Sequence, residues 1–168
     1  WRVAFLLPSL IAALGTLWCV VDLGRRLWTR RVGLYACWAL LFALQFTFQA
    51  KKAQIDPLVV LFVTLANYGL LRHLLLGSAW RWWWAGWFFA GIGVITKGVG
   101  VLALLMILPA AIASALHWPR VRLHARDLRF WLAPLAFVLA VALWLVPMVM
   151  TALATKSGEY QAYLDDIL

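Results

Sequence analysis

Six long apolar segments dominate this sequence of 168 residues. They run roughly over Val3–Leu23, Val32–Ala50, Pro57–Leu76, Trp82–Thr96, Val99–Leu116 and Phe130–Met150. A helix needs about 20 apolar residues to cross the ~30 Å hydrocarbon layer of a membrane, and most of these segments approach that length. Only 12% of the residues are charged, against about 25% in a soluble domain. We therefore predict an all-α integral membrane protein with about six transmembrane helices.

The basic residues are divided unevenly between the connections of these segments. The net charge of +9 could suggest a nucleic-acid partner. However, the first, third and fifth connections hold ten of the eleven arginines, the pattern of cytoplasmic loops. The other connections and the C-terminal tail hold all four lysines and most of the acids. We expect no nucleic acid as partner, and we expect the functional site on the lysine-bearing face, outside the cytoplasm.

Asp56-Pro57 opens the third segment, shortly after Lys51 and Lys52. Proline suits the first turn of a helix, where its missing N–H removes no hydrogen bond. Asp56 would then be the N-terminal cap, facing the positive end of the helix dipole. This arrangement places an acid at the mouth of an apolar helix with basic residues beside it. Capping alone would explain Asp56 as well as a functional role does.

Four glycines lie between Gly91 and Gly100, around Thr96-Lys97. Glycines at this density predict an interruption of the helix, with Lys97 at the break on the outer face. One interpretation is a tight turn whose lysine extends to the lipid headgroups. The other is a phosphate contact, because a lysine beside free backbone N–H groups binds anions.

Two features are expected at the cytoplasmic edge. Asp22 would be a local charge partner of Arg25 and Arg26 at a helix end. A set of indole side chains should form a belt at the headgroup level. These are Trp80, Trp82, Trp83, Trp84 and Trp87.

The C-terminal tail after Pro147 should leave the membrane. Ser157 is suited to cap a helix, with Glu159 in its first turn, and apolar residues recur at helical spacing up to Ile167. We predict an amphipathic helix lying on the outer surface.

Several motifs together resemble bacterial glycosyltransferases of the protein O-mannosyltransferase type, which include aminoarabinose transferases. They are Pro8-Ser9 followed by a helix that ends at Arg25-Arg26, Ile55-Asp56-Pro57-Leu58, the glycine-rich Thr96-Lys97-Gly98 turn, and the exit Trp144-Leu145-Val146-Pro147. Val99 departs from the proline that usually follows the turn in that family. The resemblance covers essentially the whole chain.

The resemblance implies a GT-C type bundle in the bacterial inner membrane. Such an enzyme, a hexosyl or pentosyl transferase, uses a polyprenyl-phosphate-linked sugar and glycosylates a lipid, glycan or protein on the periplasmic side. Residues 1–168 would be a single transmembrane domain, a fragment lacking the first helix, the first periplasmic loop and the C-terminal region. The membrane helices would form a groove for the polyprenyl chain.

The resemblance also implies roles for individual residues. The principal acid, the general base, would precede this fragment. Asp56 would be a second acid that orients the acceptor, or holds a divalent metal ion if one is used. Lys97, with Lys51 or Lys52, would offset charge on the departing lipid phosphate.

Two other functions remain open from the residues alone. A polytopic transporter would show acids or arginines inside the bundle, or paired broken helices. A non-catalytic membrane module would serve a partner protein. The sequence shows one glycine-rich break and keeps its charges at the segment ends, which favours the enzyme.

Overall fold

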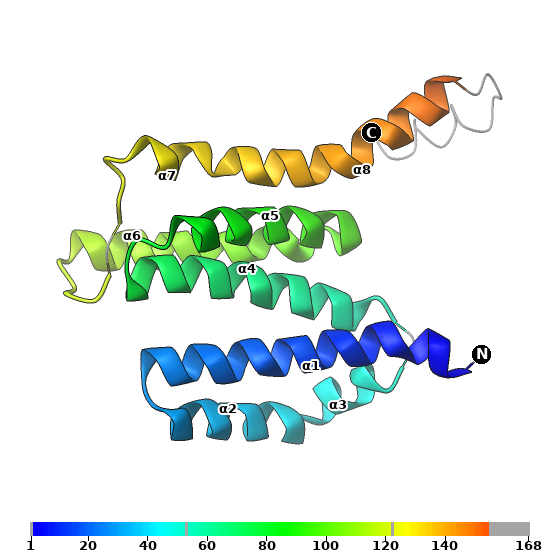
Figure 1. The fold of residues 1–168 in the computed structure, drawn as a ribbon, viewed down its shortest axis with the longest axis horizontal. Helices are drawn as coiled ribbons and strands as arrows, with labels where there is room; N and C mark the ends of the chain where they lie inside the picture. The colour runs from blue at the N-terminus through cyan, green and yellow to red at the C-terminus, as the bar shows by residue number, and fades with distance from the viewer. Residues whose placement is uncertain (1, 53, 122, 155–168) are drawn as a thin grey trace.

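The computed structural model describes residues 2–52, 54–121 and 123–154 (Figure 1). Within these ranges the chain is helical and no strand is found. The elements are α1 (Arg2–Leu27), α2 (Arg30–Phe42), α3 (Leu44–Ala50), α4 (Asp56–Leu76), α5 (Trp80–Lys97), the 3₁₀ helix η1 (Val99–Met106), α6 (Ile107–Ala115), α7 (Leu128–Leu132) and α8 (Pro134–Ala154).

The predicted all-α membrane class is confirmed, whereas the predicted number of six membrane spans is not. In the described residues, 3 helical stretches are long and apolar enough to cross a membrane: Leu6–Leu27, Asp56–Leu76 and Leu128–Thr151. A fourth span results only if α2 and α3, which meet at an angle of 74°, count as one broken helix. The apolar stretch Val99–Ala115 is shorter. The predicted surface helix around Ser157 lies outside the described residues.

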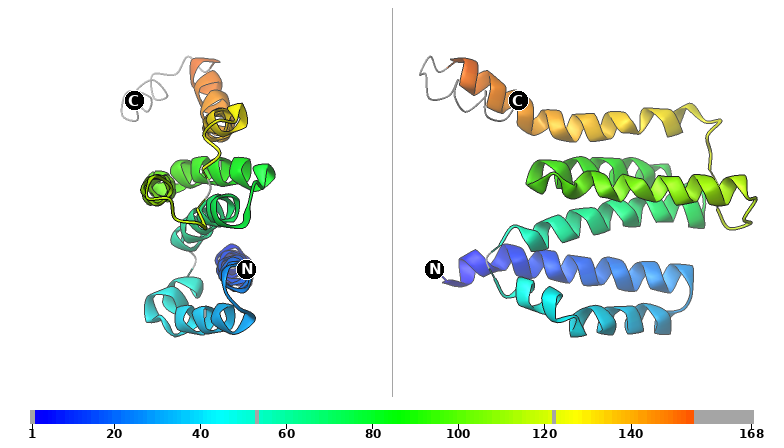
Figure 2. Two further views of the ribbon diagram at one scale, coloured as in Figure 1. Left: turned by 90° about the vertical axis from the view of Figure 1, so that its left-hand side faces the viewer. Right: turned by 180° about the vertical axis from the view of Figure 1, so that it is seen from behind.

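Successive helices run back and forth between two ends of the bundle (Figure 1). At one end lie the α1–α2 and α4–α5 connections and the loop after α6, which carry the arginines. At the other end lie the α3–α4 and α5–η1 connections, with Lys51, Lys52 and Lys97. Figure 2 shows that η1 and α6 pack beside α4 and α5, outside the plane of the other helices. The alternation predicted from the charges is thus present in the fold.

Trp83 is at the centre of the core, contrary to the interfacial belt predicted for it. Its side chain is fully buried with Leu70, Leu74 and Ala133. Its ring stacks on Phe130, with ring centroids 4.8 Å apart. The other four tryptophans of the predicted belt are only half-buried. An indole has a large apolar area, and here that area joins α4, α5 and the α7–α8 region.

A polar network ties three helices together at the arginine end. The Asp22 carboxylate accepts from Arg25 and Arg26, each at 2.5 Å, as predicted for a local charge partner. It also accepts from the Tyr68 hydroxyl on α4, at 2.6 Å. Arg72 in turn donates to the Tyr68 oxygen and lies over the Trp82 ring of α5. Asp22 is 5% exposed, so these partners offset its loss of hydration.

Glycines allow α4 and α5 to approach closely. A Cβ atom on Gly69 would lie 2.4 Å from the Trp82 carbonyl oxygen and 2.8 Å from the Gly86 nitrogen. Both are backbone atoms of α5, which cannot turn aside as a side chain can. The small-residue contact is the usual means by which membrane helices pack, because lipid provides little hydrophobic force between them.

We predict that Gly69→Leu separates α4 from α5 and lowers the free energy of unfolding by about 3 kcal/mol, the upper range for overpacking. Thermal unfolding of the full-length protein in detergent measures this. Ala36→Leu, on an exposed position of α2, introduces the same side chain and should change stability little. Equal effects of the two substitutions would contradict the close contact.

Candidate functional site

A pocket of about 600 Å³ lies at the lysine end of the bundle. Pro8 and Ser9 of α1, the segment Gln54–Asp56 that leads into α4, and Thr96 and Lys97 at the end of α5 form its walls. Three of the motifs that are far apart in the sequence therefore meet here. The fold brings them together because α1 begins beside the start of α4 and runs parallel to it, whereas α5 runs antiparallel to α4 and ends there (Figure 1).

Asp56 and Lys97 form an ion pair in this pocket. The Lys97 Nζ lies 2.5 Å from Asp56 Oδ1. The Lys97 side chain is 57% exposed and that of Asp56 is 31% exposed. The pair is accessible, so an incoming phosphate could take the ammonium from the carboxylate. The carboxylate would then be free to accept a hydrogen bond.

The predicted capping role of Asp56 is wrong. Helix α4 begins at Asp56 itself, and the residue at the cap position is Ile55, which has no side-chain acceptor. Pro57 does occupy the first turn, as predicted. Asp56 therefore remains at the positive end of the α4 dipole, with its carboxylate turned to Lys97 instead of to the backbone.

The predicted glycine-rich break is confined to one residue. Gly91 and Gly93 lie within α5, where both are buried. Gly98 ends the helix with φ at +75°, a conformation that L side chains rarely adopt. Gly100 then returns along α5, where a Cβ atom would lie 2.4 Å from Gly93 C. Lys97 is thus the last residue of α5, at the negative end of the helix dipole, where a cation is favoured.

Ser9, Gln54 and Thr96 also line the pocket, although no site role was predicted for them. The buried Ser9 hydroxyl donates to the Gln54 carbonyl oxygen at 3.3 Å and so attaches the segment before Asp56 to α1. The Thr96 hydroxyl donates to the Ile92 carbonyl oxygen, one turn earlier. The predicted topology contained the necessary signal, because it placed the polar Ser9 at the outer end of the first segment.

Lys51 and Lys52 lie at the same end of the bundle but do not line the pocket. Both are exposed, in the turn after α3. The fold thus does not bring them together with Asp56 and Lys97, and their role with the lipid phosphate stays a prediction.

The pocket residues do not fit a divalent metal ion. Asp56 is the single carboxylate among them, and it is already paired with an ammonium group. No group of three or more His, Cys, Asp or Glu side chains that could hold a metal is found in the described part of the chain. Divalent ions such as Mg²⁺ and Ca²⁺ require several oxygen ligands, which the side chains of this pocket do not supply.

The fold and pocket define an integral membrane protein of the helical-bundle class, with a charged site at one end. The chain belongs to the dolichyl-phosphate-mannose-protein mannosyltransferase family, which residues 2–150 match. No curated protein and no solved structure matches the chain. The family membership supports, in general terms, a membrane glycosyltransferase that depends on a polyprenyl-phosphate-linked sugar.

We predict that Asp56→Asn and Lys97→Ala each lower the free energy of unfolding by about 1 kcal/mol or less, because exposed ion pairs contribute little. Thermal unfolding of the full-length protein tests this. Asp22→Asn is the matched comparison, since it removes a buried carboxylate that accepts from Arg25, Arg26 and Tyr68, and it should cost about 2 kcal/mol or more. A loss for Asp56→Asn as large as for Asp22→Asn would make the Asp56–Lys97 pair a structural element.

Proposed function

We propose that this bundle moves a sugar from a polyprenyl-phosphate donor to an acceptor on the periplasmic side of the bacterial inner membrane. The observation that carries the proposal is the meeting of Pro8-Ser9, Asp56 and Thr96-Lys97 around one accessible pocket. The orientation rests on the arginine-rich connections, which favour the cytoplasm and leave the lysine end outside.

Lys97 would bind the donor phosphate. As the bond between the anomeric carbon and the phosphate oxygen breaks, its electron pair remains on the phosphate. A cation held next to that oxygen stabilises the developing charge. Lys97 is suited to this because Gly98 fixes the end of α5 and because the ammonium group is exposed. Lys51 and Lys52 would attract the anionic donor toward the pocket from outside it.

Asp56 would orient the acceptor. Its carboxylate can accept a hydrogen bond from an acceptor hydroxyl or amine once Lys97 has turned to the phosphate. The acceptor then attacks the anomeric carbon from the side opposite the phosphate, with inversion. The acceptor's proton passes to the carboxylate of the principal acidic residue, the general base, which we propose lies in the longer protein before the Pro8-Ser9 helix. The acceptor is a lipid, a glycan or a protein, and the sugar is a hexose or a pentose.

We expect both pocket substitutions to reduce transfer strongly in membranes that contain the full-length protein. Lys97→Ala should lower kcat by about 100-fold or more, the usual loss of one preorganised charge-stabilising group. Asp56→Asn should lower it by about 100-fold through misplacement of the acceptor. The measurement is transfer of radiolabel from a polyprenyl-phosphate sugar pool.

Lys52→Ala is the control, because it removes the same charge at the same end of the bundle without altering the pocket. It should leave kcat within about two-fold and raise the KM for the donor only slightly, since the attraction by an exposed charge is screened by salt. Activity of Asp56→Asn within a few-fold of the unchanged protein would overturn the role of Asp56. Absence of transfer from any donor, with the protein correctly inserted, would overturn the function.

A further inference from the structure

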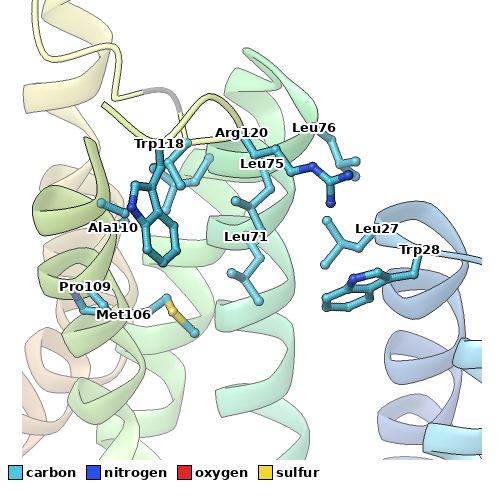
Figure 3. Close-up of a pocket in the computed structure, with 13 residues that line it drawn as sticks. Leu27, Trp28, Leu71, Leu75, Leu76, Met106, Pro109, Ala110, Trp118 and Arg120 are labelled. Carbon is cyan, nitrogen blue, oxygen red and sulfur yellow. The ribbon is translucent and has the colours of Figure 1, made fainter. Parts of the chain in front are cut away.

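A second pocket, of about 480 Å³, lies at the opposite, arginine-bearing end of the bundle. Four leucines of α4 form one side, here called the leucine wall: Leu71, Leu74, Leu75 and Leu76. The other sides are formed by η1, α6 and the end of α1, and the loop after α6 lies above the pocket (Figure 3). The volume is within the ~300–1,000 Å³ range of ligand sites. Apart from Arg120, its lining consists of apolar side chains. The pocket therefore suits a hydrocarbon chain.

The charged side chain at the mouth limits what that hydrocarbon chain can belong to. Figure 3 shows Arg120 reaching from the loop toward Leu76 and Leu27, at the upper rim of the pocket. Arg120 is exposed, and no carboxylate pairs with it in the described part of the chain. A cation above an apolar cavity is complementary to a molecule with an anionic head and a hydrocarbon tail.

Two further arginines extend this positive charge. An adjoining hollow shares Leu76 with the apolar pocket and is lined by Arg26 and Arg72. Arg72 is held by Tyr68 and pairs with no carboxylate in the described residues. Arg26 is held by Asp22, whose single charge it shares with Arg25, so the fixed cluster keeps a net positive charge. Fixed guanidinium groups bind phosphate oxygens well, because little freedom is lost on binding.

Tryptophans on opposite sides of the pocket indicate the depth at which it lies. Trp28 follows α1 and Trp118 lies in the loop after α6, and their side chains are 63% and 61% exposed. Figure 3 shows them on either side of the leucine wall. Indole rings favour the headgroup level of a membrane. The mouth with Arg120 would therefore lie among lipid phosphates and the leucine wall among acyl chains.

We propose that this pocket binds an anionic glycerophospholipid of the leaflet at the arginine end, with one acyl chain on the leucine wall and the phosphate at Arg120. This site is separate from the pocket of Asp56 and Lys97, and the inference does not rest on glycosyl transfer.

The test uses the purified full-length protein in detergent, with phosphatidylglycerol as probe and phosphatidylcholine as the zwitterionic comparison. Native mass spectrometry gives an apparent Kd for each lipid. We expect phosphatidylglycerol to bind more tightly. Arg120→Gln should weaken it about five-fold, the contribution of one basic residue near anionic lipid. Arg126→Gln, in the same loop but outside the pocket, should leave the Kd unchanged.

A second pair of variants tests the acyl-chain pocket. Ala110→Phe fills the space beside the leucine wall and should weaken lipid binding about ten-fold, the expected effect when roughly two methylene groups of the acyl chain are no longer buried. Ala111→Phe, at the next position of α6 but exposed and outside the lining, should not. Thermal unfolding without added lipid confirms that each variant is folded.

Several outcomes would overturn the proposal. Equal effects of Arg120→Gln and Arg126→Gln would show that the lipid is attracted by the overall charge of the loop and not bound at Arg120. Equal Kd values for the two lipids would mean that the phosphate site does not distinguish charge. Equal effects of the two phenylalanine variants would exclude the pocket as the binding place. A lipid-free dimer that Ala110→Phe dissociates would assign the pocket to a second copy of the chain.

Discussion

The close antiparallel contact of α4 and α5 is the constraint on which the site depends. Gly69 and Gly86 bring the two backbones together, and the residues Gly77–Ala79 join the helices in a short turn. With 21 and 18 residues, α4 and α5 are about 32 Å and 27 Å long. Counted from the shared turn, their far ends differ by about one helical turn. The long side chain of Lys97 covers that difference and reaches Asp56.

The carboxylate at one end of the bundle, that of Asp22, is buried, whereas the Asp56–Lys97 pair at the other end is exposed. At the arginine end, Asp22 is buried and bonded to Arg25, Arg26 and Tyr68, so its removal would take the acceptor away from the buried Tyr68 hydroxyl and from two arginines. This network stabilises the packing of α1, α4 and α5. At the lysine end the ion pair is exposed, and each partner is already favoured by its own helix dipole. The Asp56–Lys97 pair can therefore open at a cost of about 1 kcal/mol or less.

The sequence predicted the helical segments and their alternation better than it predicted their packing. Apolar runs and arginine-rich connections determined the class and the two faces, and both are found in the fold. The burial of Trp83 was missed because lipid is as apolar as a protein core, so hydropathy does not distinguish a side chain facing lipid from one facing a helix. The composition of the glycine-rich stretch likewise could not show that Gly98 alone adopts a positive φ.

The sequence could single out the charged residues of the candidate site but not their contact with each other. Asp56 and Lys97 stood out because charge is rare in this chain, and the topology placed them on one face. Their contact, and the attachment of Gln54 by Ser9, depend on which helices are neighbours. Which helices are neighbours is decided by backbone contacts such as the one at Gly69, and no pattern in a single sequence predicts such a contact.

The two ends of the bundle differ in whether the cation that would meet a phosphate group is already paired with a carboxylate. Lys97 is held by Asp56, so a phosphate bound there must compete with a carboxylate, which weakens binding and favours release. Arg120 faces no carboxylate in the described residues and stands above an apolar wall that can retain an acyl chain. Under the proposed function, the lysine end would bind a phosphate that departs in each turnover, whereas the lipid site proposed at the arginine end would retain its occupant.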